Sequence, residues 1–181
     1  MRTILTPAVL PDTALDELKS WLGISTPAED ATLTELLRAA LEVCEGFTGS
    51  MPLEQDCEEL LPARAGCWQS LGTRPMQAIT SVEGIPAEGA SFALAADAYA
   101  IDLGADGGAR VRLIRQGAAG RIAVRFTAGL AADWDSLPDS LRHGLIRLAA
   151  FAWRQRDDES SDALPPAVVA ALWRPWRRYR L

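Results

Sequence analysis

The sequence has few of the residues on which most enzymes depend. It contains one histidine, three cysteines and one lysine among 181 residues. A Ser-His-Asp or Cys-His site would have to use His143, and no serine lies in a Gly-x-Ser-x-Gly sequence that would expose it as a nucleophile. His143 can be a general base or a helix residue packed by its neighbours, and its place in a predicted helix favours packing. We therefore expect no catalytic residue and no enzymatic activity.

Metal and cofactor motifs are also missing. Nine residues lie between Cys57 and Cys67, and no histidine is nearby, so a zinc site is not indicated. The Gly-rich stretch 102–110 lacks both nucleotide-binding glycine patterns and is typical of a loop between two strands. The acidic stretch 54–59 lacks the alternating ligands of a calcium loop and indicates a solvated acidic face. We expect no metal ion and no cofactor.

Long hydrophobic runs and export signals are lacking too. No segment approaches the roughly 20 apolar residues of a membrane-spanning helix. Residues 1–19 contain two prolines and no clear cleavage site. The odd number of cysteines does not suggest a disulfide framework. These features predict a soluble cytosolic protein without a membrane role.

Charge is distributed unevenly along the chain. Residues 1–141 carry twenty acidic and ten basic side chains, a net charge of −10. Residues 142–181 carry eight basic and four acidic side chains, a net charge of +4. The chain finishes in WRPWRRYRL at residues 173–181, with no acidic residue among them. An acidic protein thus ends in a basic, aromatic segment.

The C-terminal segment has four interpretations: a contact with another protein, with nucleic acid, with the protein's own core or with a membrane surface. A membrane contact is disfavoured, because one short tail without lipidation gives little anchoring. Arginine and aromatic residues are enriched at the energetically important positions of protein interfaces. The same mixture can stack on single-stranded nucleic acid, but an acidic body repels phosphate, which favours a protein partner. In the third interpretation Trp173 and Trp176 cap the protein's own core and the arginines are solvated.

Hydrophobic periodicity predicts the order helix, helix, β region, helix, helix. The helices are expected at about 12–22, 29–48 and 137–157, with a short last helix after 165, and the β region spans about 53–128. We expect an α+β fold that is mainly α, a bundle of N- and C-terminal helices with an inserted small antiparallel β lobe. Residues 1–164 would form one domain, and residues 165–181 would form the C-terminal helix and the basic aromatic tail.

Two predicted strands alternate apolar and basic residues. The sequences ARVRLI and RIAVRF, at residues 109–114 and 121–126, each predict one buried and one basic face. Arg112 and Arg125 lie on these basic faces. The faces can be ordinary solvated surface or parts of an interface.

Several segments together resemble the head–tail connector (adaptor) proteins of long-tailed phages and gene transfer agents. The segments are LDELKSWLGIS followed by EDATLTELLRAALEVCEGFTG, then VRFTAGL, LPDSLRHGLIRLAAFAWRQRDD and ALPPAVVAALWRPWRRYRL. Their order matches the family over about residues 12–180. No single motif is diagnostic, and the order of the elements carries the resemblance.

The resemblance implies a structural virion protein and no enzyme. It implies a helical bundle with an inserted β lobe, assembled with other copies as a ring of about a dozen subunits below the portal. The portal protein, a downstream tail or stopper protein and the passing DNA would be its partners. The protein would be found in the virion at the head–tail interface, and in the host cytoplasm during assembly.

The resemblance also implies a role for the C-terminal segment, because the family's last residues reach into the portal ring. The residues that match by position are Trp173, Arg174, Trp176, Arg177, Arg178, Tyr179 and Arg180. Opposite charges on different faces could set the register between ring subunits, which makes Arg112 and Arg125 candidate subunit-interface residues. Two other functions stay open, a nucleic-acid-binding accessory protein that uses the basic tail and a small enzyme of unknown type.

Overall fold

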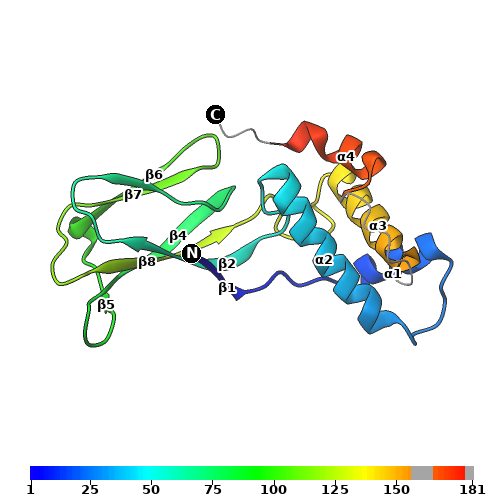
Figure 1. The fold of residues 1–181 in the computed structure, drawn as a ribbon, viewed down its shortest axis with the longest axis horizontal. Coiled ribbons are helices and arrows are strands. Elements are labelled where there is room, and N and C mark those ends of the chain that lie inside the picture. The colour runs from blue at the N-terminus through cyan, green and yellow to red at the C-terminus, as the bar shows by residue number, and fades with distance from the viewer. Residues whose placement is uncertain (156–164, 178–181) are drawn as a thin grey trace. The chain divides into compact units, whose positions relative to one another are not determined.

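The chain folds as two compact units, which the computed structural model describes over residues 1–155 and 165–177. The β unit comprises Met1–Pro7 and Glu54–Gly129, and the helical unit comprises Ala8–Leu53 and Leu130–Leu181. Within the described residues, the β unit holds eight strands and the helical unit holds four α-helices (Figure 1). The division expected at residue 164 falls outside the described residues.

The expected fold class was wrong. The β part is not a small lobe inserted into a helical bundle, because it has two antiparallel sheets of its own and takes in the N-terminal strand β1 (Arg2–Thr6). All five residues of β1 are exposed on the sheet edge. A strand exposed on both faces shows no alternation of apolar and polar residues, so its sequence gave no strand signal.

The larger sheet has five strands in the order β1-β2-β8-β4-β5, and all of its pairs are antiparallel. Its strands after β1 are β2 (Gln55–Pro62), β4 (Met76–Ile85), β5 (Phe92–Ala93) and β8 (Arg121–Ala128). The central strand β8 is the most deeply buried of them, with five of its eight residues enclosed. The core of the unit therefore forms around β8.

The smaller sheet has three strands in the order β3-β7-β6. These are β3 (Trp68–Ser70), β6 (Tyr99–Leu103), which follows a short 3₁₀ turn, and β7 (Ala109–Leu113). The Gly-rich stretch joins β6 to β7 as a loop, as its sequence predicts. Along β7 the apolar residues are buried and the two arginines point to the other face, so the predicted alternation is confirmed here.

The acidic stretch 54–59 is not the solvated face that its sequence indicates, because most of it forms β2. Glu59 is only 6% exposed, and its carboxylate accepts hydrogen bonds from Gly72 N at 2.9 Å and from Thr73 N and Oγ1 at 2.9 and 2.6 Å. Asp56 accepts a hydrogen bond from Thr127 Oγ1 at 2.9 Å. These carboxylates stabilise turns and strand pairs of the β unit.

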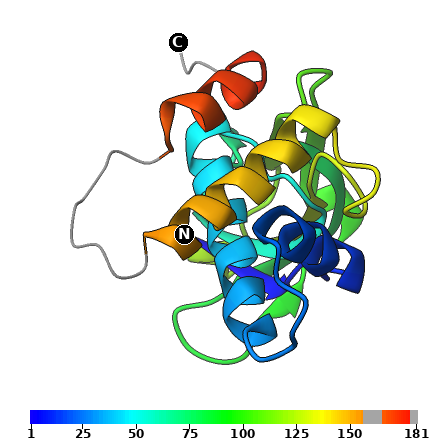
Figure 2. The same cartoon turned by 90° about the vertical axis from the view of Figure 1, so that its right-hand side faces the viewer.

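The helical unit consists of α1 (Asp12–Leu22), α2 (Asp30–Thr48), α3 (Asp139–Arg154) and α4 (Ala167–Trp173), followed by a 3₁₀ turn at Arg174–Trp176. Each helix lies within two or three residues of its expected range, because the spacing of apolar residues is strongly helical. In Figure 2, α3 crosses α2, with α1 and α4 on either side of α3. The buried faces share one core, whose largest fully buried members are Leu18, Leu33, Leu37, Leu53, Trp134, Leu145 and Trp173.

Glycines end the two N-terminal helices. Gly23 and Gly49 follow α1 and α2 with φ of 72° each, in the left-handed region that glycine adopts without strain. Among the described residues, no helix is both long and apolar enough to span a bilayer.

Candidate functional site

His143 is a packed residue on α3. Its Nε2 accepts a hydrogen bond from Arg147 Nε at 2.9 Å, and its ring meets Trp21 edge-on with centroids 5.2 Å apart. Arg147 in turn lies over Trp21, 5.3 Å from the ring centroid. These contacts agree with the packed interpretation of His143. Over residues 1–155 and 165–177, no group of three or more His, Cys, Asp or Glu side chains is arranged to hold a metal ion.

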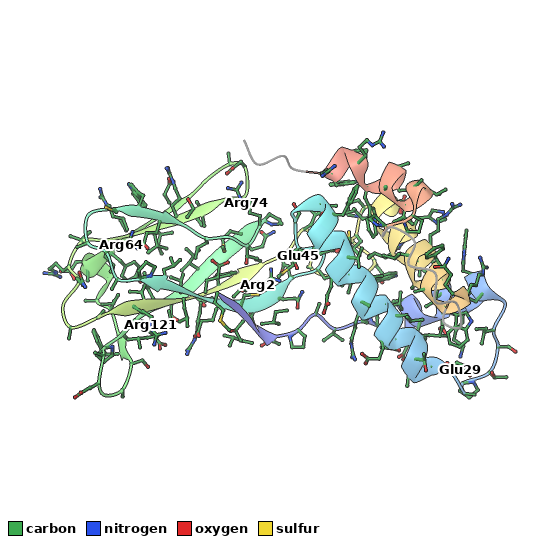
Figure 3. The ribbon with its side chains drawn as sticks, viewed as in Figure 1. Arg2, Glu29, Glu45, Arg64, Arg74 and Arg121 are labelled. Atoms are coloured by element: carbon green, nitrogen blue, oxygen red, sulfur yellow. The ribbon has the colours of Figure 1, made fainter. Side chains whose placement is uncertain are left out.

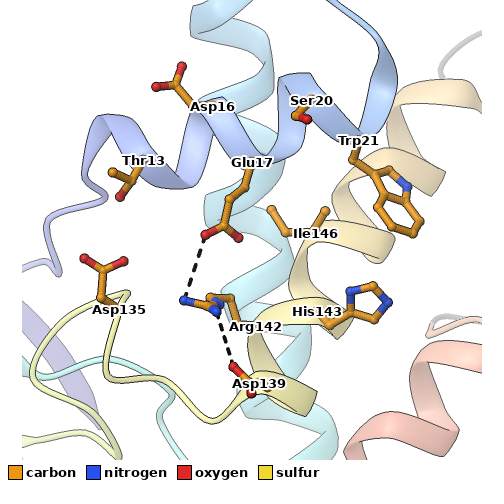
Figure 4. Close-up of a pocket in the computed structure, with 10 residues that line it drawn as sticks. All are labelled: Thr13, Asp16, Glu17, Ser20, Trp21, Asp135, Asp139, Arg142, His143 and Ile146. Carbon is orange, nitrogen blue, oxygen red and sulfur yellow. Dashed lines mark hydrogen bonds and ion pairs between the residues drawn. The ribbon is translucent and has the colours of Figure 1, made fainter.

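A groove of about 1100 Å³ lies between α1 and α3, and we call it the acidic groove. Figure 4 shows its lining side chains, which are Thr13, Asp16, Glu17, Ser20, Trp21, Asp135, Asp139, Arg142, His143 and Ile146. Arg142 bridges the two sides, with nitrogens 3.9 Å from Glu17 Oε1 and 3.2 Å from Asp139 Oδ1. Trp134, buried behind the groove, donates from Nε1 to Glu17 Oε1 at 3.3 Å.

The groove has an excess of negative charge. Arg142 provides the counter-charge for two of its four carboxylates, Glu17 and Asp139. The other two, Asp16 and Asp135, are exposed, and neither forms an ion pair with a described residue. Four carboxylates beside one guanidinium can receive a further cationic side chain.

The C-terminal segment begins inside the fold. Trp173 is fully buried, and its Nε1 donates to Leu141 O at 3.3 Å. Its indole fills the space that Gly144 leaves on α3, since a methyl group added at Gly144 would lie 2.1 Å from Trp173 Nε1. Phe47 of α2 packs on the other side, with ring centroids 6.1 Å apart. For Trp173 the structure therefore supports the core-capping interpretation.

The next described residues, apart from Trp176, are exposed. Trp176 is half-buried and donates from Nε1 to Ser140 Oγ at 2.9 Å, while Arg174 is exposed. The Arg177 guanidinium lies over Phe47, 5.2 Å from the ring centroid. The three remaining predicted portal-binding residues, Arg178, Tyr179 and Arg180, lie outside the described residues.

Arg125 lies between two acidic side chains on the larger sheet. Its Nε donates to Glu58 Oε2 of β2 at 2.9 Å, and its Nη1 lies 3.1 Å from Glu83 Oε1 of β4. The hydrogen bond to Glu58 and the charge of Glu83 raise the pKa of the Arg125 guanidinium above its ordinary value. The charge of Arg125 is thus compensated within its own chain, and the residue joins three neighbouring strands.

Arg112 has different surroundings. Its guanidinium carbon lies 4.9 Å from the centroid of the Trp68 ring, and that of Arg110 lies 5.5 Å from the same centroid. Arg110 also forms an ion pair with Asp102, its cross-strand neighbour on β6. Arg112 forms no ion pair within the described residues, and its Nε is buried there without a hydrogen-bond partner. We call Trp68, Arg110 and Arg112 the Arg–Trp face.

From the sequence Arg112 was a candidate interface residue, whereas its neighbour Trp68 and the acidic groove were not candidates. Trp68 lies 44 residues before Arg112, and only the register of β3 against β7 brings them together. The groove joins α1 to the start of α3, more than 110 residues later. The spacing of Asp139, Arg142 and Ile146 on one side of α3 was the available local signal, although it does not identify the facing element.

The two units also differ in charge. The β unit carries nine acidic and eight basic residues, a net charge of −1, and the helical unit carries fifteen acidic and ten basic residues, a net charge of −5. Figure 3 labels arginines of the β unit (Arg2, Arg64, Arg74 and Arg121) and glutamates of the helical unit (Glu29 and Glu45). The negative charge of the protein is therefore concentrated in its helical unit.

The chain is similar to solved structures from gene transfer agent particles. One is a chain from the neck of an empty particle computed with C6 symmetry, with a TM-score of 0.77, 30% identity and coverage of 100% of this chain and 97% of that chain. A second, from the virion of a native particle, has a TM-score of 0.74, 31% identity and the same coverage. A third, from the neck of a native particle computed with C12 symmetry, has a TM-score of 0.73, 28% identity and coverage of 99% and 97%.

No protein-family model and no curated protein matches the chain. The structural matches extend over essentially the whole chain in both units, at identities of 30% and 31% for the two particle chains named first. Because the matches cover the whole chain, they include both the sheets and the helices. The chain therefore belongs to the family of structural virion proteins that form the neck of gene transfer agent particles.

Proposed function

We propose that this protein is the adaptor of a phage-like particle, a head–tail connector that forms a ring against the portal and joins the DNA-filled head to the tail. Its membership in a family of neck proteins supports this proposal, and related chains come from neck assemblies with C6 and C12 symmetry. A twelve-fold ring of this chain would continue the channel for DNA. A downstream tail or stopper protein would bind the opposite side.

The burial of Trp173 is the observation that carries the proposed portal contact. Because Trp173 is held against Leu141 and Gly144, the segment starts at a fixed place on the helical unit. The residues after it are basic and aromatic, and they suit a protein interface. Arg174 and Arg177 to Arg180 would contact the portal, while Trp173 and Trp176 position the segment.

The proposed ring needs an interface between unlike surfaces of neighbouring copies. Arg112 and Arg125 remain the proposed interface residues, with different roles. Arg125 forms ion pairs with Glu58 and Glu83, and it would act indirectly by stabilising the arrangement of side chains on this surface of the sheet. Arg112 has no internal counter-charge among the described residues and would contact the neighbour directly.

The test is to mix the purified protein with its cognate portal ring and to image the product by electron microscopy. We expect an added ring of density on the portal with the full-length chain. Deletion of residues 177–181 should abolish this ring without loss of stability. This deletion retains the buried Trp173, which a deletion starting at residue 173 would remove from the core.

A matched control replaces Arg38, an exposed arginine paired with Glu35 on α2, by alanine and should leave the ring intact. A ring that survives the deletion would show that the C-terminal segment is not the anchor. If the full-length protein adds no density but shifts DNA mobility in a salt-dependent way, the nucleic-acid-binding interpretation would replace the adaptor.

A further inference from the structure

The Arg–Trp face has an unmet electrostatic requirement. Trp68 is 40% exposed, although it is a large aromatic residue on a short edge strand. Its ring lies beside both guanidinium groups of the face, close enough for a cation–π contact with each. Asp102 compensates Arg110, but Arg112 has no counter-charge within the described residues and keeps one buried donor unsatisfied. A carboxylate that reaches the Arg112 guanidinium from outside would supply the missing counter-charge.

The acidic groove has the complementary requirement. Asp16 and Asp135 lie at its opposite sides and have no cationic partner among the described residues. Trp21, which is 42% exposed, adds an apolar surface at the same groove. Its ring is held by His143 and Arg147. The groove thus offers fixed negative charge next to an ordered aromatic side chain.

We infer that the Arg–Trp face of one copy docks on the acidic groove of a second copy, an inference that rests on the proposed ring. The two surfaces have opposite charge and belong to different units, so one copy can take part in two contacts, one through each surface. Repetition of such a contact between unlike surfaces closes a ring when the rotation between copies allows it. Tryptophan and arginine are enriched at the centres of interfaces, and the charge pairs would fix the register.

A second copy fits these surfaces better than nucleic acid does. Phosphate would be repelled by the carboxylates of the groove, and the helical unit as a whole has a net charge of −5. On the Arg–Trp face only Arg112 is uncompensated within the described residues, and one arginine gives little affinity for a phosphate backbone. When the face of one copy docks on the groove of another, Arg112 gains a carboxylate partner and the groove carboxylates gain a cationic partner.

Charge reversal on each surface tests the inference. Arg112→Glu alters the face, and the double variant Asp16→Arg/Asp135→Arg alters the groove, where neither aspartate side chain forms an ion pair with a described residue. Each should raise the protein concentration needed for half-complete ring assembly on the portal by about tenfold or more. The triple variant, with both surfaces reversed, should restore assembly to within a few-fold of the original protein.

Matched controls separate this contact from a general effect of charge. Arg121→Glu makes the same charge change as Arg112→Glu at an exposed position of β8, and Glu42→Arg/Glu88→Arg matches the double variant at exposed positions away from the groove. Both controls should assemble normally. Thermal unfolding of every variant identifies any loss of assembly that comes from misfolding.

A mixing experiment gives an independent readout. In a 1:1 mixture, Arg112→Glu keeps an intact groove and the Asp16→Arg/Asp135→Arg variant keeps an intact face. The unaltered face can then dock on the unaltered groove, and the reversed face can dock on the reversed groove as in the triple variant. The 1:1 mixture should therefore assemble on the portal as rings of alternating subunits, which native mass spectrometry can identify by mass, while neither variant assembles alone.

The outcomes separate this inference from the proposed function. If the folded single-surface variants still form full rings on the portal, or if the triple variant is not restored, the docking of face on groove is wrong and the adaptor proposal stands. If the unaltered protein itself adds no ring to the portal, the proposed function fails and the inference fails with it.

Discussion

Replacing Gly144 by alanine tests how the C-terminal segment is held. Considered as helix sequence alone, the change should stabilise α3, because alanine is favoured over glycine in a helix interior by about 1 kcal/mol. The structure predicts the opposite sign. The new methyl group would lie 2.1, 2.8 and 2.9 Å from three atoms of the Trp173 indole, which is fully buried and cannot rotate freely.

The size of the effect follows from the two ways in which the protein can respond. Overpacking that shifts the indole costs about 1–3 kcal/mol, and complete expulsion of the side chain approaches the about 3–5 kcal/mol typical of removing a buried tryptophan. After subtraction of the gain in helix propensity, we expect a net loss of about 2 kcal/mol. For a protein of this size that loss lowers the melting temperature by roughly 4–8 °C.

Differential scanning calorimetry measures the shift, and Gly46→Ala is the matched control. Gly46 lies in α2, is exposed, and has no atom within 4 Å of an added methyl group, so its replacement should be neutral or stabilising. A red shift of tryptophan fluorescence in Gly144→Ala alone would report exposure of Trp173. Equal stability of the two variants would refute the close packing of Trp173 against α3.

Two further predictions concern the thiols and an acidic turn. Burial raises the pKa of the Cys44 thiol to about 12, so Cys44 should resist alkylation at pH 8 in the native protein, while the exposed Cys67 reacts quickly. Modification of Cys44 as fast as that of Cys67, measured by mass spectrometry of peptides, would contradict this burial. The Ser136 hydroxyl, followed by its backbone N–H, holds the pKa of Asp133 below its usual range. A depressed carboxyl pKa stabilises the fold above the unfolded pKa of about 3.9, and this stabilisation is lost as the pH falls through the folded pKa. Ser136→Ala should therefore be less stable than the unaltered protein at pH 7 and converge with it below about pH 4, as urea titrations would measure; a constant difference across this range would sink the argument.

The helices could be predicted from the sequence because their signal is local. Apolar residues repeat every three or four positions through α1, α2 and α3, and the repeat sets their positions closely. The alternation of buried and basic residues along β7 is equally local. Both patterns depend on neighbours a few residues away, which is the range over which a sequence can be interpreted directly.

The extent of the β unit and the candidate surfaces could not be predicted, because both depend on contacts between residues that are far apart in the sequence. β1 joins the larger sheet by pairing with β2, more than 50 residues later, and this pairing makes the β part a unit of its own. Glu59 was interpreted as solvated, although the turn at residues 72–73 buries it. The acidic groove likewise exists only once α1 lies against α3.

The contacts of the C-terminal segment divide it into two parts with separate roles. Trp173 and Trp176 bond to α3 within the helical unit, so their interactions belong to the folded state. Arg174 and Arg177 are exposed on the same unit, and they belong to the proposed portal contact. The aromatic and the basic residues of the segment thus have different roles, which accounts for a basic, aromatic segment in an acidic protein. Trp173 and Trp176 attach the segment to the core of the helical unit, and the arginines carry the positive charge that we propose contacts the portal.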